Sequence, residues 1–135
     1  MIEYQIENTL STEEFTQVLV NSTLGERRPI DQPERISKML EHANLIITAR
    51  QKGKLVGIAR SLTDFAYCTY LSDLAVDEKY QNLGIGKELI RQTKLASPDA
   101  KLILLAAPKA VHYYPHIGMS QYEFCYLLDK AEDLQ

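Results

Sequence analysis

The chain has 135 residues, a formal net charge of −3 at pH 7 and 45% apolar residues. A chain of this length is typical of a single domain and buries roughly two-thirds of its unfolded surface, so we expect one domain spanning residues 1–135. The negative charge argues against a nucleic-acid binder, and no apolar run approaches the roughly 18 residues of a membrane helix, so neither partner is expected.

The first predicted elements are a strand and a helix. Met1–Glu7 alternates between apolar and polar residues and predicts a strand. Ser11 is a suitable N-cap for a helix that runs to about Ser22, and Glu14 completes a capping box. These signals are local and therefore predict the start of the helix better than its end.

A second helix and a strand pair follow. Asp31 is the predicted cap of a helix that ends near His42. The apolar runs Leu45–Ala49 and Leu55–Ser61 are separated by a polar, glycine-containing turn at residues 51–54. This pattern predicts an antiparallel hairpin.

The second half of the chain alternates strands and helices. We expect strands at Tyr67–Val76, Lys101–Ala106 and Phe124–Leu128, and helices at Ile85–Ala96 and Lys109–His116. The continuous apolar run in the second of these strands favours a buried central position. The whole order predicts an α/β fold of the mixed α+β kind, with a mixed sheet and helices on both faces.

A glycine-bearing segment, Tyr80–Lys87, lies between a predicted strand and a predicted helix, where backbone N–H groups can bind an anion. A Walker A loop needs a glycine at position 81 and a hydroxyl residue at 88, but the chain has Gln81 and Glu88. A dinucleotide fingerprint needs a third glycine at 89, where the chain has Leu89. The remaining Gln-x-x-Gly-x-Gly pattern fits a phosphate cradle or a plain strand-to-helix turn.

This pattern, at Gln81–Gly86, resembles the coenzyme A loop of the GCN5-related N-acetyltransferase (GNAT) superfamily. Tyr113–Met119 resembles the late Phe-Tyr-x-x-x-Gly-Phe segment of the same superfamily, and the predicted element order is similar over nearly the whole chain. The resemblance implies a GNAT-like fold with a mostly antiparallel central sheet. In that fold the parallel strands Tyr67–Val76 and Lys101–Ala106 would splay apart.

The resemblance also implies acetyl-CoA as co-substrate, with no metal. The pantetheine arm would lie along the main chain of Leu74, Ala75 and Val76. The pyrophosphate would lie over the backbone N–H groups of the glycine loop, because a helix N-terminus attracts anions. These cofactor-binding residues are Gln81, Asn82, Leu83, Gly84, Ile85, Gly86 and Lys87.

A tyrosine four residues before the late glycine is the proton donor of the family. Counting back from Gly118 gives Tyr114, which by this resemblance would donate a proton to the leaving thiolate. Tyr113 is the fallback, because it points about 100° away around the helix. The alternative is that either tyrosine simply packs in the core.

A base or a water chain must remove a proton from the attacking amine. Asp73 interrupts the apolar run Leu71–Val76 near the expected splay, which makes it the candidate base. Glu78 is a weaker candidate. A carboxylate at position 73 is equally consistent with an ion pair or a solvated strand face.

Two groups of basic residues also allow two interpretations each. Lys87, Arg91 and Lys94 share a helix face that either meets the nucleotide phosphates or is merely solvated. Arg27 and Arg28 lie in the connector at residues 23–33, where the acceptor is expected, and either bind an anionic group of the acceptor or are solvated.

The predicted function is an N-acetyltransferase that moves an acetyl group from acetyl-CoA to a primary amine, by direct attack in a ternary complex. A small-molecule amine is the expected acceptor. The alternatives are a protein N-terminal or lysine acetyltransferase and, in another class, a non-catalytic acyl-CoA-binding sensor.

The compartment and assembly are predicted from weaker signals. Residues 1–4 lack the basic and apolar regions of a signal peptide, and two cysteines are too few for a disulfide framework. We therefore expect a cytoplasmic protein. A homodimer is possible by resemblance and by the general frequency of two-fold dimers.

Overall fold

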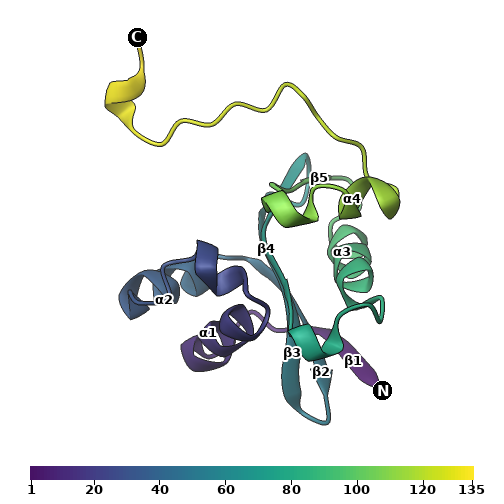
Figure 1. Cartoon of the computed structure of the whole chain (residues 1–135). Coiled ribbons are helices and arrows are strands. Elements are labelled where there is room, and N and C mark those ends of the chain that lie inside the picture. The colour runs from purple at the N-terminus through teal and green to yellow at the C-terminus, as the bar shows by residue number, and fades with distance from the viewer. The chain divides into compact units, whose positions relative to one another are not determined.

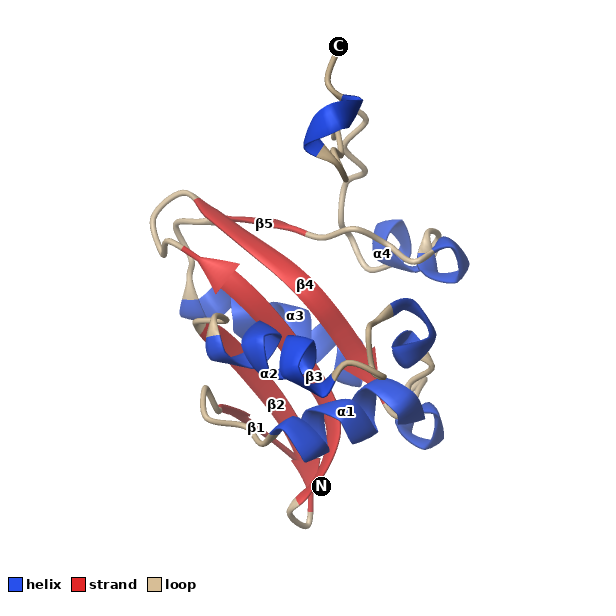
Figure 2. Ribbon diagram, turned by 90° about the vertical axis from the view of Figure 1, so that its left-hand side faces the viewer, coloured by secondary structure: helices blue, strands red, loops and turns tan.

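The computed structural model describes residues 1–135, which form two compact units, residues 1–105 and residues 106–135. The first unit contains a five-stranded sheet and three helices (Figure 2). The second contains one short helix and two single 3₁₀ turns. Each unit is described by itself.

The sheet of the first unit has its strands in chain order. Neighbouring strands are antiparallel from the first to the fourth, whereas the last two are parallel. This mixed sheet agrees with the predicted fold class. The strands are β1 (Ile2–Ile6), β2 (Leu45–Gln51), β3 (Lys54–Thr63), β4 (Cys68–Val76) and β5 (Lys101–Ile103).

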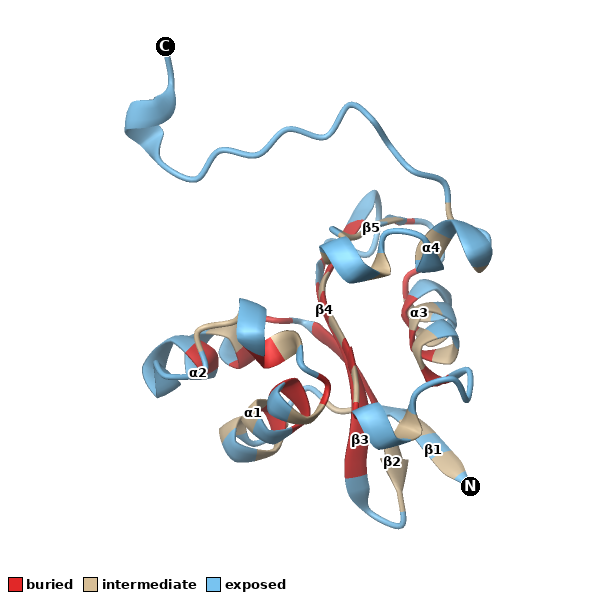
Figure 3. Ribbon diagram, viewed as in Figure 1, coloured by how far each residue is buried: buried red, intermediate tan, exposed pale blue.

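Helices cover both faces of the sheet, as expected (Figure 1). The helices α1 (Thr12–Asn21) and α2 (Pro33–Glu41) pack on one face, and α3 (Ile85–Ala96) packs on the other. Buried residues line both sides of the sheet, so the strands have apolar side chains on each face (Figure 3). The first core includes Phe15, Leu19, Ile36, Ile46 and Ile58, and the second includes Ile47, Val56, Leu71, Ile85 and Leu89.

The helix starts follow the local sequence with two corrections. The Ser11 hydroxyl accepts the Glu14 N–H at 3.2 Å, which confirms the predicted cap of α1. The Glu14 carboxylate binds Arg50 at 2.7 Å, so it does not complete the capping box. The prediction that Asp31 caps α2 is wrong: the helix begins one residue later, at an N-cap Gln32 whose side chain makes no capping bond, and a proline occupies its first turn.

Two predictions about the last strands are wrong. β5 is three residues long and lies at the edge of the sheet, not at its centre. Residues 124–128 form no strand, and their side chains are exposed (Figure 3). The errors have one cause, because an apolar run becomes a central strand only when a second strand pairs with its other edge. The expected helix at residues 109–116 is a 3₁₀ turn at Pro108–Ala110 followed by α4 (Tyr113–His116).

None of the helices combines the length and the apolar character that crossing a membrane would require.

The β3–β4 turn is organised by Asp64. Its Oδ1 atom accepts the backbone N–H groups of Tyr67, Ala66 and Cys68 at 2.8, 2.9 and 3.1 Å. These bonds, that from Tyr67 foremost, lower the pKa of the exposed carboxyl from 3.8 to about 2. The folded state therefore holds the ionised form more tightly than the unfolded state does.

We predict that Asp64→Ala lowers the melting temperature at pH 7, and that the difference from the native protein shrinks as the pH falls from about 4 to about 2. Protonation of the native carboxyl removes the same bonds that the variant lacks. Thermal melts at a series of pH values measure this. The exposed Asp31, substituted by Ala, is the control, and an Asp64→Ala difference that stays constant down to pH 2 would contradict the prediction.

Candidate functional site

The parallel pair of strands ends early and leaves one edge of β4 open. Pairing between β4 and β5 covers only Cys68 to Tyr70, opposite Lys101 to Ile103, whereas β4 continues to Val76. The two strands therefore part in the way that the resemblance implied. Backbone N–H and C=O groups along the remaining edge of β4 are left without a neighbouring strand.

A bulge in β4 decides which groups face this edge. Arg60 of β3 lies opposite Asp73, and Ser61 lies opposite Leu71, so Ser72 is the extra residue. Before the bulge, the Cys68 carbonyl accepts a bond from the β3 side, which shows that even-numbered residues face β3 there.

Beyond the bulge the alternation is inverted. The Asp77 N–H donates to the Val56 carbonyl of β3 at 2.8 Å. Because backbone groups alternate along a strand, Ala75 also faces β3, whereas Leu74 and Val76 face the open edge. Leu74 and Val76, two of the three β4 residues expected to hold the pantetheine arm, thus have their main chain at the open edge.

The segment after β4 is tied down by side chains. Asp77 accepts the Lys79 N–H at 2.9 Å and so caps the turn that follows β4. The Tyr80 hydroxyl donates to Gln51 of β2 at 2.8 Å. The Gln81 amide donates to the Val76 carbonyl at 3.1 Å, which gives this predicted cradle residue a defined place at the end of the strand.

The glycine loop itself has the backbone of an anion cradle. Asn82 and Gly84 have φ values of 65° and 81°, and Leu83 and Ile85 between and after them do not share this sign. Such alternation makes successive N–H groups converge on one point. The first backbone bond of α3 runs from Glu88 to the Gly84 carbonyl, so the N–H groups at the start of the helix have no intrahelical acceptor.

These two features fit coenzyme A. An open strand edge suits an arm that carries amides, and a convergent set of N–H groups suits a pyrophosphate. A Cβ built on Gly84 would meet nothing within 4 Å, so the glycine is required for its backbone conformation and leaves the approach to the loop open.

The three basic residues predicted to share one face of α3 differ in their contacts. Lys94 donates to the carbonyls of Pro98 and Ala100 at 3.1 and 2.6 Å, so it holds the loop that follows α3. Arg91 pairs with Glu88 at 2.9 Å on the surface. Lys87 is exposed in the first turn of α3, next to the cradle.

Asp73 is fully buried and has two arginine partners. Arg28 Nε lies 2.5 Å from its Oδ1 atom, and Arg60 Nε hydrogen-bonds to its Oδ2 atom. Both carboxylate oxygens are therefore occupied, and an amine reaches them only by displacing an arginine. This geometry disfavours the predicted base, although the catalytic role of Asp73 stays a prediction. Glu78, the second candidate, is exposed in the turn after β4.

The connector before α2 contains the two arginines that the sequence could not separate. Arg28 points inward to Asp73, whereas Arg27 is exposed. Sequence analysis missed Arg60 altogether, although an arginine in an otherwise apolar strand, like Asp73 in the next one, is a signal for a buried ion pair.

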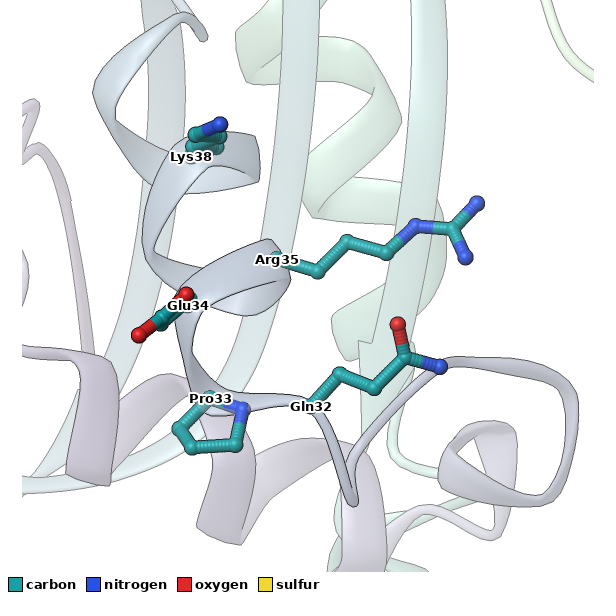
Figure 4. Close-up of a pocket in the computed structure, with 5 residues that line it drawn as sticks. All are labelled: Gln32, Pro33, Glu34, Arg35 and Lys38. Carbon is teal, nitrogen blue, oxygen red and sulfur yellow. The ribbon is translucent and has the colours of Figure 1, made fainter.

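A shallow pocket, also not anticipated, lies at the start of α2. Figure 4 shows the side chains of Gln32 and Arg35 extending to the same side of the helix start. The lining includes two cationic side chains and one carboxylate. Its residues are Gln32, Pro33, Glu34, Arg35 and Lys38.

Tyr114 and Tyr113 lie in α4 of the second unit. Their rings meet edge to face, with centroids 5.2 Å apart. Tyr114 is half-buried, and burial, with a smaller contribution from Tyr113, raises the pKa of its phenol above 10. Gly118, with φ +104°, follows the end of the helix, and the Met119 N–H donates to the Tyr114 carbonyl at 3.0 Å.

The mixed sheet with helices on both faces, the open β4 edge and the glycine loop together have the arrangement of an acyltransferase fold. The family described as "Acetyltransferase (GNAT) domain" matches residues 7–123, and the chain belongs to this family. The predicted family, fold class and enzyme class are thereby confirmed at the level of the family. Acetyl-CoA is the acyl donor that GNAT enzymes use.

Individual proteins similar to the chain agree with this assignment. The uncharacterized N-acetyltransferase ycf52 of Porphyra purpurea is 29% identical over 100 residues, which cover 68% of this chain and 55% of that protein. The chain therefore spans about half the length of the curated relatives it matches.

Solved structures show the same fold. A GNAT family acetyltransferase from Streptococcus pneumoniae has a TM-score of 0.77 at 20% identity, covering 96% of this chain and all of that one. The aminoglycoside N-acetyltransferase AAC(6')-Iy, solved in complex with CoA, has a TM-score of 0.74 at 14% identity, covering 97% and 95%.

We predict that Gly84→Ala weakens coenzyme A binding about tenfold, which corresponds to roughly 1.4 kcal/mol. The left-handed backbone is unfavourable for alanine, so the loop relaxes out of its convergent conformation. Isothermal titration calorimetry with coenzyme A measures this.

Gly53→Ala is the matched control for this substitution. Gly53 has φ +83° in the β2–β3 turn, and a Cβ there also meets nothing within 4 Å. The same strain should therefore arise without loss of affinity. Equal affinities for the two variants would argue against the cradle.

Proposed function

We propose that the protein transfers an acetyl group from acetyl-CoA to a primary amine of a small molecule, by direct attack in a ternary complex. The observation that supports this most is the open edge of β4, which leads directly into a convergent N–H cradle. A donor with an amide-bearing arm and a pyrophosphate can use both at once.

The chain's own residues would bind the donor in two places. The main chain of Leu74 and the N–H of Val76 would add the arm to the sheet, since the Val76 carbonyl already accepts a bond from Gln81. The loop from Gln81 to Lys87 would bind the pyrophosphate. A negative charge at a helix N-terminus gains roughly 0.3–1 kcal/mol when exposed and up to about 2 when partly buried. Lys87 would add a cation on the exposed side.

Acetyl-CoA supplies an activated thioester, whose carbonyl carbon the amine attacks. A C–N bond forms, the C–S bond breaks, and the sulfur leaves with the electron pair. Tyr114 would then donate its phenolic proton, or a hydrogen bond, to the sulfur, while the amine loses a proton to water.

The raised pKa of Tyr114 decides how far this proton moves. Ordinary tyrosine and thiol pKa values, near 10 and 8.5, already make full transfer uphill by roughly 2 kcal/mol. Burial increases this difference, so we assign Tyr114 chiefly as a hydrogen-bond donor to the developing thiolate. Burial therefore moves the ionisation of this phenol to higher pH than that of an ordinary tyrosine, which keeps the proton available for the hydrogen bond.

Two observations support a small cationic amine as acceptor. The net charge of −3 favours positively charged ligands by steering. A structure with the same fold, AAC(6')-Iy, is an aminoglycoside N-acetyltransferase by its printed name. A protein N-terminus or lysine remains the alternative acceptor, and an acyl-CoA sensor has no use for Tyr114. A single domain over residues 1–135, a cytoplasmic location and a homodimer stay predictions.

We predict that Tyr114→Phe lowers kcat about 10²–10⁴-fold with little change in acetyl-CoA affinity, because only the hydroxyl is lost. Steady-state kinetics and calorimetry measure the two quantities. Tyr113→Phe is the control and should keep its activity. The reverse result would move the role to Tyr113, and full activity of both variants would exclude a tyrosine donor.

A screen tests the function itself. Coenzyme A should raise the melting temperature of the protein, whereas NAD and ATP should not. Amines of several classes, together with a lysine-containing peptide, are then offered with acetyl-CoA while released thiol is measured. Turnover with a small cationic amine is the expected result. Turnover with the peptide alone would favour the protein acceptor, and stabilisation without any turnover would favour the sensor.

A further inference from the structure

A buried cluster of three charged residues joins the connector before α2 to the sheet. Asp73 is fully buried, and its two oxygens accept bonds from Arg28 and Arg60. The arginine side chains are 22% and 6% exposed. An ion pair so far from water contributes little net stability compared with apolar residues, although losing one partner is costly. The position of this cluster relative to β4 therefore says more about its role than its contribution to stability does.

The same two guanidinium groups hold the bulge residue of β4. Arg28 Nη2 donates to the Ser72 carbonyl at 2.9 Å, and Arg60 Nη2 donates to the Ser72 hydroxyl at 3.1 Å. Arg60 also donates to the Met39 carbonyl of α2 at 2.9 Å. Ser72 is thus fixed by residues from outside its own strand.

The bulge sets the direction of every backbone group that follows it. Without the extra residue at position 72, the strand would shift by one, and Leu74 and Val76 would turn toward β3. The open edge would then present Asp73 and Ala75 instead. The arginines hold the one residue whose conformation prevents this shift.

We propose that Arg28, Asp73 and Arg60 are positioning residues, which act through the Ser72 bulge to set the register of the open β4 edge. This inference rests on the proposed function, because that edge is where the acyl donor is expected to lie. The cluster also fixes Arg28 and with it the connector on the acceptor side. In this role Asp73 is not the base, and its carboxylate serves to orient the two guanidinium groups.

The expected effect is on turnover more than on donor binding. A misplacement of about 1 Å between reacting groups can cost about 10²-fold in rate, whereas the pyrophosphate cradle is separate from the bulge. Arg28→Met should therefore lower kcat about 10²-fold while the KM for acetyl-CoA changes much less. Arg28→Lys keeps the charge, but a lysine cannot donate to Asp73 and to the Ser72 carbonyl with the two-pronged geometry of a guanidinium. Its kcat should therefore lie between those of the native protein and Arg28→Met.

Two controls separate positioning from general stability. Arg27→Met alters the neighbouring exposed arginine and should leave the melting temperature and the hydrogen exchange of residues 71–74 unchanged. Arg50 also has a largely buried guanidinium with two carboxylate partners, Glu7 and Glu14, but lies away from the bulge. Arg50→Met should lower the melting temperature comparably without lowering kcat, when all variants are assayed well below their melting temperatures.

Asp73→Asn distinguishes the positioning role from the base. If Asp73 is the base, Arg28→Met leaves the carboxylate in place and keeps turnover, while Asp73→Asn abolishes it. If the cluster positions the bulge, both substitutions lower kcat to a similar degree. The first pattern would overturn the inference, as would equal losses of kcat in Arg28→Met and Arg50→Met.

Hydrogen exchange provides a readout that needs no acceptor. Amides of residues 71–74 should exchange faster in Arg28→Met than in the native protein or in Arg27→Met, because the bulge is released. Unchanged exchange would overturn the inference even if kcat fell. If the native protein acetylates no amine, the proposed function fails, while faster exchange in Arg28→Met still supports the cluster as the support of the bulge.

Discussion

Parallel pairing between β4 and β5 ends after Tyr70, and β4 then continues to Val76 with one edge unpaired. An open strand edge can bond to water or to an added strand, so this edge suits a ligand that carries amides. The remaining features of the first unit are arranged around this edge. Two helices cover one face of the sheet, and α3, which begins where the strand's turn ends, covers the other.

The two ends of the open β4 edge are held in different ways. At its start, the buried cluster of Asp73 with Arg28 and Arg60 holds the Ser72 bulge. At its far end, backbone conformation alone creates the convergent N–H groups, with Gly84 in the left-handed region. A bulge needs support from other elements because strand register can slip, whereas a tight turn is held largely by its own residues.

Helix α3 was predicted to the residue, and the Ser11 cap was predicted with its partner, because both follow from short-range spacing and capping chemistry. The edge position of β5 was not predicted, since an apolar run of this kind has the same sequence pattern in an edge strand and in a central strand. Residues 124–128 illustrate the same limit. Their continuous apolar run, which includes two aromatic residues, predicts a strand, but a strand exists only with a pairing neighbour.

The sequence alone predicted the family and located the glycine loop and the candidate tyrosines, because these depend on residues a few positions apart in a turn or a helix. Only the tertiary structure showed which charges pair. Asp73 meets partners 45 and 13 residues earlier in the chain, and no local pattern distinguishes Arg28 from Arg27. A carboxylate that looked free to accept a proton is occupied, because burial of its charge is tolerated only when opposite charges surround it.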